Sequence, residues 1–289
     1  MTERLSDVEA RIGSVRQLSA VVTAMRGIAA ARSREARNHL AGIRAYADAI
    51  AGAIGQALAL LPERPTIVGA GRGDHAIVVL CAEQGFVGAF NEKILDAAAA
   101  VVPPGRAGRF LLAGDRGAMI AAERGLTVEW SAPMITHVDQ AADLAGRIID
   151  ALYERLGDRS ISEVTLVYAA PETAADLDIT RKRLVPFDYQ RFPLMHMSEP
   201  PLISQPAGQL AEKLAEEYIF AEILEAVTLS FAAENEARTR AMIAARTNVA
   251  KTLDNLTALS RQLRQEEITN EIVELAGGTK EAQSNSDRN

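Results

Sequence analysis

The chain has 289 residues, a formal net charge of −7 at pH 7 and only 4% aromatic residues. An acidic chain with few aromatic side chains does not have the composition of a nucleic-acid-binding protein. Its single cysteine, Cys81, excludes an internal disulfide and a cysteine-based zinc site, and a reducing compartment suits such a chain. The first residues lack the apolar core of a signal peptide, and the most apolar stretch, 49–61, is too short to span a bilayer. We therefore expect a protein that is soluble or that reaches a membrane only through a partner.

A first long helix is predicted over residues 1–61, a stretch without proline. Five glycines within it lower its stability as a lone helix and leave room for another backbone to approach. Apolar residues recur every three or four positions, which indicates an amphipathic helix; they are Leu5, Val8, Ile12, Val15, Leu18, Val22, Met25 and Ala29.

The middle of the chain alternates between short apolar runs and helical segments, after a proline- and glycine-rich linker at 62–73. This alternation predicts a small α/β domain over 74–190, Rossmann-like in its order and with a mainly parallel sheet. The last strand follows its predecessor without a helix between them, so we expect it to be an antiparallel edge. The expected strands are 76–81, 109–113, 126–130, 162–169 and 180–187, and the expected helices are 91–102, 115–123 and 139–156.

A second long helix is predicted over residues 207–277, because Gln209–Ala276 contains neither glycine nor proline. At about 1.5 Å per residue it would be roughly 100 Å long, too long to be buried in one globular core. We expect Gly277-Gly278 to end it and 278–289 to form a polar tail. A stripe with a period close to 3.5 residues indicates a left-handed coiled coil; it contains Met242, Ala245, Val249, Leu253, Leu256, Leu259 and Leu263.

The two long helices are expected to pair with each other, antiparallel, with the α/β domain inserted between them. Their charge is uneven. Residues 11–44 contain seven arginines and one acid, 238–264 contain six basic residues and one acid, and 212–236 contain seven acids and one lysine. The basic zones predict a collar that faces an acidic partner, although such runs also occur on ordinary solvated helix surfaces.

The middle domain offers no catalytic constellation that the sequence can identify. Gly85-Phe-Val-Gly88 follows the first strand and opens a helix, a place where phosphate can bind, but neither a full G-x-G-x-x-G nor a Walker motif is present. The four histidines are scattered, so we expect no metal. Cys81 is interpreted as a small core residue, and nothing distinguishes Glu83 and Asp115 from surface acids. We expect no cofactor.

Four segments match the motifs of one known family, in the family's order and over nearly the whole chain. The two specific ones are Thr23–Arg32 and Arg264–Glu274, and Glu83–Asn91 and Gly114–Gly117 support them. In turn they resemble Thr-Lys-Ala-Met-x-x-Val-Ala-Ala-x-Lys, Arg-Gln-x-x-Ile-Thr-x-Glu-Ile-x-Glu, Asp-x-Gly-Leu-Cys-Gly-x-x-Asn and Gly-x-Lys-Gly. These are motifs of the gamma subunit of F-type ATP synthases.

The chain also departs from the family's pattern. Val87 replaces the family's usual cysteine, and Ser260-Arg261 replaces a Tyr-Asn pair. Such changes indicate an outlying branch of the family.

The resemblance implies a role as the central rotor shaft of an ATP synthase. The paired helices would stand inside a ring of alpha and beta subunits, and the α/β domain would be a foot that joins epsilon and the membrane ring of c subunits. The shaft would transmit torque between the c-ring and the catalytic beta subunits and so couple ion flow to ATP synthesis or hydrolysis. It would hold no active site, and it would lie at the cytoplasmic face of the bacterial inner membrane.

The resemblance also implies roles for particular residues. Contact with the acidic lever segment of beta falls to Met25 and Arg26, and a further contact with beta falls to Arg264, Gln265, Thr269 and Glu271. Glu199 and Pro200 would face the c-ring and epsilon.

Two other interpretations stay open on the residues alone. The chain would be a nucleotide-binding α/β protein with a coiled-coil dimerisation arm, or a structural adapter whose coiled coil recruits partners. The first would bind a nucleotide by itself. If the two ends of one chain pair with each other, the shaft is favoured over both of these interpretations.

Overall fold

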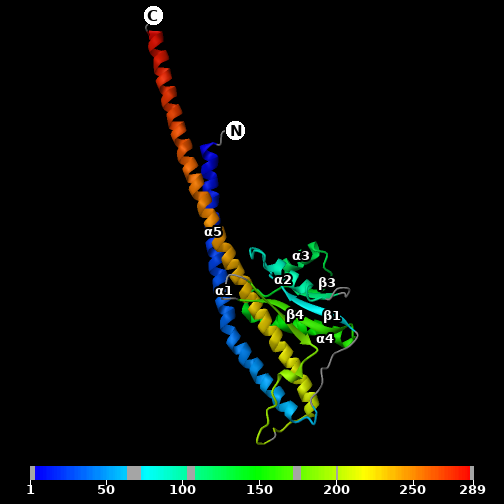
Figure 1. Ribbon diagram of the computed structural model, residues 1–289. Coiled ribbons are helices and arrows are strands. Elements are labelled where there is room, and N and C mark those ends of the chain that lie inside the picture. The colour runs from blue at the N-terminus through cyan, green and yellow to red at the C-terminus, as the bar shows by residue number, and fades with distance from the viewer. Residues whose placement is uncertain (1–3, 64–72, 103–107, 172–176, 200, 287–289) are drawn as a thin grey trace. The chain divides into compact units, whose positions relative to one another are not determined.

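Two long helices and a small α/β domain make up the fold (Figure 1). The chain divides into two compact units, one of residues 1–27 with 242–289 and the other of residues 28–241. The structure is a computed structural model. It describes residues 4–63, 73–102, 108–171, 177–199 and 201–286, with the side chains described as far as residue 273.

A five-stranded sheet forms the centre of the unit 28–241, with strand order β3-β2-β1-β4-β5. The first four strands pair in parallel, whereas β5 pairs antiparallel with β4 at one edge. The mainly parallel sheet and its antiparallel edge are therefore confirmed. The strand bounds are Asp74–Leu80 for β1, Gly108–Ala113 for β2, Val128–Ala132 for β3, Ile161–Ala170 for β4 and Asp178–Val185 for β5.

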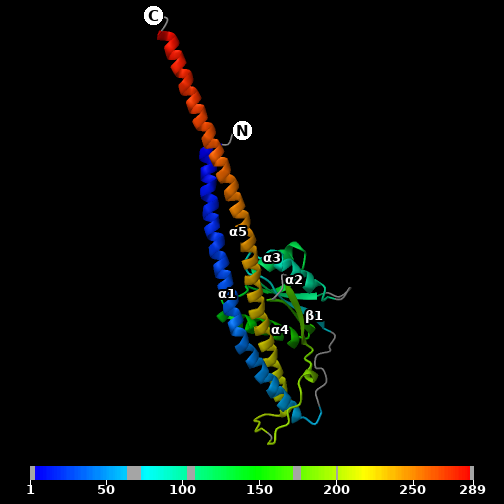
Figure 2. The same ribbon diagram turned by 60° about the vertical axis from the view of Figure 1, so that its left-hand side comes forward.

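Helices lie on both faces of this sheet (Figures 1 and 2). One face carries α2 and α3, and the other carries α4 and parts of the two long helices. The helices are α1 (Leu5–Ala59), α2 (Phe90–Ala99), α3 (Asp115–Glu123), α4 (Ala141–Gly157) and α5 (Ala207–Ser286), with 3₁₀ turns at Val138–Gln140 and Tyr189–Arg191.

The central strand β1 is buried on both sides. Ala76, Val78 and Leu80 pack toward α4 and the long helices, whereas Ile77 and Val79 pack toward α2 and α3. Successive side chains of a strand point to opposite faces, so a strand that is covered twice must be apolar at every position. This is why β1 is an unbroken apolar run in the sequence.

The long helices are part of the core of this unit rather than an attachment to it. Ile223, Ala226 and Val227 of α5 are fully buried in the cluster that also holds Ala36 and Leu40 of α1. The predicted foot, 74–190, contains every strand, but its core is completed by segments of both long helices. The long helix α5 can complete this core because one side of it is apolar and packs against the sheet.

In the unit of residues 1–27 and 242–289 the two helices run antiparallel (Figure 2). Val8, Ile12 and Leu256 form its buried seam, and Val15, Leu253, Leu259 and Leu263 pack against them. The antiparallel coiled coil predicted for the two ends of the chain is confirmed in this unit.

Two details of the helix prediction were wrong. Leu18 is half exposed, while Ser19 and Val22 continue the seam after Val15. Spacings that alternate between three and four keep a 3.5-residue seam in register, so position 19 faces the partner helix. Gly277-Gly278 does not end α5, which continues to Ser286. Glycine lowers helix stability by about 1 kcal/mol per residue but does not forbid a helix.

Arg238, which is buried beside Glu234 of the same helix, fixes α5 to the loop that follows β1. Nη2 of Arg238 lies 2.6 Å from Oε1 of Glu234, and both side chains are buried. The same guanidinium donates to the carbonyls of Gln84 and Gly85, at 3.2 and 3.3 Å. Burial raises the pKa of Glu234, and the charge and hydrogen bond of Arg238 oppose that shift. Ser230 adds a hydrogen bond from its hydroxyl to the Leu80 carbonyl at 3.2 Å.

We expect Arg238→Met to destabilise the chain by about 3–5 kcal/mol, because it leaves the Glu234 carboxylate buried without its partner. Urea unfolding followed by circular dichroism measures the loss. Arg240→Met removes an exposed arginine two residues further along α5 and serves as the matched control. It should change stability by less than about 0.5 kcal/mol. Equal unfolding midpoints for the two variants would contradict the anchoring role of Arg238.

Candidate functional site

The acidic stretch of α5 is partly neutralised within the unit 28–241. Arg37 forms an ion pair with Glu236, and Nε of Arg44 lies 2.7 Å from Oε1 of Glu225. Two of the seven arginines of the predicted collar therefore serve to hold α1 against α5. The basic surface that is left for a partner is smaller than the charge count predicts.

Met25 and Arg26 lie on the part of α1 that belongs to the coiled-coil unit, and both are half-buried. They follow Glu9 by 16 and 17 positions, which is about 24–26 Å along a helix at 1.5 Å per residue. The predicted contacts with beta therefore form two separate places on the coiled coil, because Arg264 lies beside Glu9.

Arg264 does not extend freely into solvent. Its Nη2 donates to Oε1 of Glu9 at 2.6 Å, although both side chains are well exposed. Gln265, Thr269 and Glu271 are exposed on the same helix, and the Thr269 hydroxyl donates to the Gln265 carbonyl at 2.8 Å. The structure thus brings four predicted residues to one helical stretch and adds Glu9, which sequence reasoning missed. No sequence signal identifies Glu9, because its pairing with Arg264 depends on the register of the two helices.

Apolar side chains lie exposed beside these polar residues on α5. Ile268, Ile272 and Val273 are exposed to 50%, 61% and 64%. Ile268 and Ile272 are four positions apart and therefore share one side of the helix. A gathered group of exposed apolar residues indicates a surface that a partner covers.

A second exposed apolar group lies on the loop between Tyr189–Arg191 and α5, which projects away from the sheet (Figures 1 and 2). Glu199 lies on this loop and is exposed, whereas Pro200 falls outside the described residues. The loop exposes five large apolar side chains, Leu194, Met195, Met197, Leu202 and Ile203.

The base of this loop is firmly held. The Met195 amide donates to the Gly55 carbonyl at 3.1 Å, and a Cβ on Gly55 would lie only 2.4 Å from the Pro193 carbonyl oxygen. Arg191 pairs with the buried Glu222, whose Oε1 also lies 3.0 Å from Nζ of Lys182. An aromatic group packs around this pair; it contains Phe187, Tyr189, Phe192 and Tyr218. The loop therefore presents its apolar tip from a rigid platform.

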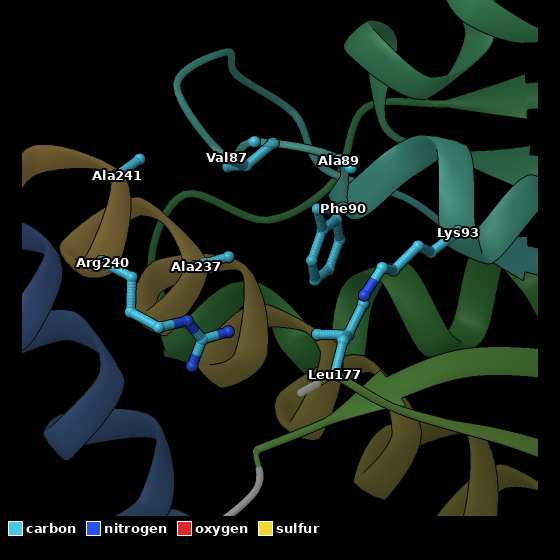
Figure 3. A pocket seen from close by; sticks show the side chains of 9 residues that line it. Val87, Ala89, Phe90, Lys93, Leu177, Ala237, Arg240 and Ala241 are labelled. Atoms are coloured by element: carbon cyan, nitrogen blue, oxygen red, sulfur yellow. The ribbon is translucent and has the colours of Figure 1, made fainter. Parts of the chain in front are cut away.

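The turn that suggested a phosphate site borders a small pocket instead (Figure 3). The pocket is lined on one side by Val87, Ala89 and Phe90. Arg240 lines it from α5, and Lys93 also contributes to its wall. Its volume is about 230 Å³, below the roughly 300–1,000 Å³ of typical small-molecule sites. The pocket does not favour a nucleotide.

The polar groups of this turn are used for structure. Glu83 accepts the backbone N–H groups of Asp115 at 3.1 Å and Met134 at 2.7 Å. Asn91 accepts the Ala82 N–H at 2.8 Å. Cys81 is fully buried, and burial raises the pKa of its thiol, so it acts as the small core residue that was predicted. Sequence reasoning did not identify this role of Glu83, because its partners, Asp115 and Met134, come from distant segments.

Within the described residues, no group of three metal-ligating side chains is assembled. Across the same part of the chain, no helix is long and apolar enough to span a membrane.

The solved structures that the fold resembles are parts of ATP synthases. The Euglena gracilis mitochondrial ATP synthase rotor matches with a TM-score of 0.64 at 14% identity, over 91% of this chain and 98% of that chain. The OSCP/F1/c-ring assembly from the same organism matches with a TM-score of 0.66 at 12% identity, over 98% and 95%. At such low identity these matches establish the fold.

The sequence comparisons go further than the fold. An ATP synthase gamma chain of Solibacter usitatus is 28% identical, over 96% of this chain and 99% of that relative. One of Bdellovibrio bacteriovorus is 27% identical, over 95% and 97%. The family model described as ATP synthase matches residues 4–281. The chain therefore belongs to the ATP synthase family, among its gamma chains.

Proposed function

We propose that this chain is the central rotor shaft of an F-type ATP synthase. In this role it transmits torque between the membrane c-ring and the catalytic beta subunits and couples ion flow to ATP synthesis or hydrolysis. The observation that carries the proposal is the continuity of the long helices. Both α1 and α5 are unbroken from the coiled-coil unit into the unit that contains the sheet.

Torque needs a firm connection between the α/β domain and a helix, and the contacts of α5 suit this need. Its residues 223–232 are buried against the sheet, and Arg238 binds two loop carbonyls and Glu234. Close-packed interiors deform little, so a turn of the domain turns α5 with it. A loosely tethered domain would lose the torque in local motion.

The catalytic ring is the partner we propose for the coiled-coil unit. Exposed Ile268, Ile272 and Val273 give it an apolar surface to be covered, and Arg264 and Gln265 give it hydrogen-bond donors that suit carboxylates. Met25 and Arg26 are proposed to contact beta at the second place. The asymmetric surface of a turning shaft would contact the three beta sites differently and so bias their nucleotide affinities, which is a population shift.

The apolar loop 193–206 is the surface we propose for the c-ring and epsilon, with Glu199 and Pro200 on it. Its rigid base supports this assignment, because a coupling surface must not yield under load. The shaft would then be a peripheral protein at the cytoplasmic face of the bacterial inner membrane, in contact with the membrane only through its partners. We propose that it is non-catalytic and leaves ATP chemistry to beta.

Arg264→Ala should leave assembly with alpha and beta intact but lower ATP-driven ion pumping several-fold, because a charged hydrogen bond to beta is worth about 1.5–3 kcal/mol. Reconstituted vesicles with an internal pH or sodium dye measure the pumping. Gln262→Ala, an exposed change on the same helix, is the control. Unchanged pumping and ATPase rates in the Arg264 variant would remove this residue from the contact.

The purified chain alone should hydrolyse no ATP. A coupled assay on a preparation shown by mass spectrometry to be free of alpha and beta tests this. Steady turnover that survives such purification would favour the nucleotide-binding interpretation.

Met197→Asp should weaken co-purification with detergent-solubilised c-ring, because an acidic side chain would replace an apolar contact at the interface. Met119→Asp is a close control, since both methionines are exposed to 54% and Met119 lies on α3, away from the loop. The same loss of c-ring in both variants would contradict a specific role for the loop.

A further inference from the structure

One buried carboxylate on α5 pairs with cations from two other segments. The Glu222 side chain is only 3% exposed, and its Oε1 lies 3.0 Å from Nζ of Lys182 on β5. The same oxygen accepts a hydrogen bond from Nη2 of Arg191, which ends the turn Tyr189–Arg191. Glu222 therefore joins the long helix to the edge of the sheet and to the segment from which the apolar loop 193–206 begins.

The two cations hold different parts of the chain. Lys182 lies within β5, where its backbone is already fixed by pairing with Leu166 of β4. Arg191 lies two residues before the apolar loop, at the end of a three-residue turn. Loss of the Lys182 contact would leave the strand in the sheet, whereas loss of the Arg191 contact would release a restraint on the start of the loop.

The direction of the Arg191 side chain is fixed as well as its charge. Its guanidinium carbon lies 5.3 Å from the centroid of the Phe192 ring and 5.0 Å from that of Tyr218. Its Nη2 also donates to the Tyr218 hydroxyl at 3.1 Å. A planar guanidinium that lies over aromatic rings and donates to two acceptors has little freedom to turn. A lysine at this position would keep the charge but not this geometry.

We propose that Glu222 is a positioning residue for coupling, which acts through Arg191 to hold the apolar loop in the direction in which it meets the c-ring. The proposal rests on the proposed function, because it takes this loop as the c-ring contact. Arg191 carries load from the loop into α5. Lys182 supplies a second cation, which helps to offset the cost of burying the Glu222 carboxylate.

A purely stabilising carboxylate would behave differently. Loss of either cation leaves Glu222 with one remaining partner, so a role in stability alone predicts similar effects for Arg191 and Lys182. A positioning role predicts an effect that is confined to the cation on the loop side. Arg191→Gln and Lys182→Gln are therefore a matched pair, and the two cations are similarly exposed, at 33% and 30%.

Distances between two nitroxide labels on the full chain test the positioning role. Met197→Cys carries one label on the loop and Met119→Cys carries the other on α3; both sites are exposed, and the fully buried Cys81 does not compete. Double electron–electron resonance gives the distribution of distances between the labels. Arg191→Gln should broaden this distribution at least twofold, whereas Lys182→Gln should leave it close to that of the parent.

Two further variants separate charge from geometry. Glu222→Gln keeps the shape of the side chain but removes the charge that attracts Arg191, so it should broaden the distribution as well. Arg191→Lys keeps the charge but loses the planar contact with Phe192 and Tyr218, so its effect should fall between those of the parent and Arg191→Gln.

The link to coupling is measured in reconstituted vesicles, without labels. Ion pumping and ATP hydrolysis are followed on the same preparation, and their ratio gives the ions moved for each ATP. Arg191→Gln should lower this ratio at least twofold. Lys182→Gln should leave it unchanged.

The outcomes separate the positioning role from the proposed function. Distance distributions that both cation variants broaden equally, or that neither changes, overturn the positioning role. A broadened distribution with an unchanged pumping ratio overturns its link to coupling. Failure of the unmodified chain to assemble with alpha, beta and the c-ring would contradict the proposed function, while the distances in the chain alone would still decide whether Glu222 positions the loop.

Discussion

The fold depends on the burial of one stretch of α5 against the sheet. A helix of 80 residues cannot be covered by a domain of this size, so most of it must find other partners. Residues 223–238 are covered by the sheet, α4 and the loop after β1, and Ala211, Ala215 and Ala221 before them lie in a second buried cluster. That burial fixes this stretch of α5 to the sheet.

The same stretch explains why a charged pair is tolerated in the core. Burial of an unpaired carboxylate costs several kcal/mol. For Glu234 this cost is offset by Arg238 beside it and by hydrogen bonds from the backbone of Glu83 and Gln84. An apolar pair would fill this space as well, but it would not bind the carbonyls of the loop. The ion pair therefore serves to hold the loop and the helix together, which is what a torque-bearing joint requires. On the proposed function, this joint passes force from the foot to the shaft.

Much of the fold follows from the sequence because local patterns and burial agree. The bounds of α3 were predicted to the residue, and β5 was placed at an antiparallel edge simply because no helix precedes it. Leu18 misled the prediction, since a half-exposed leucine and a seam leucine look alike in a spacing count. The contacts of the candidate site were harder to predict from the sequence. Glu9 and Arg264 are 255 positions apart in the sequence, and only the register of the two paired helices brings them together. Glu83 reaches the two backbone amides that it binds only after the sheet has formed.

Rotation of a single complex tests the central claim most directly. The alpha–beta ring is fixed to a surface, and a bead is attached through Met197→Cys on the exposed loop, where the buried Cys81 does not compete for the label. If the chain is the shaft, the bead turns in one direction when ATP is added and stops when ATP is removed. ATP hydrolysis by the same complex with a motionless bead would contradict the account.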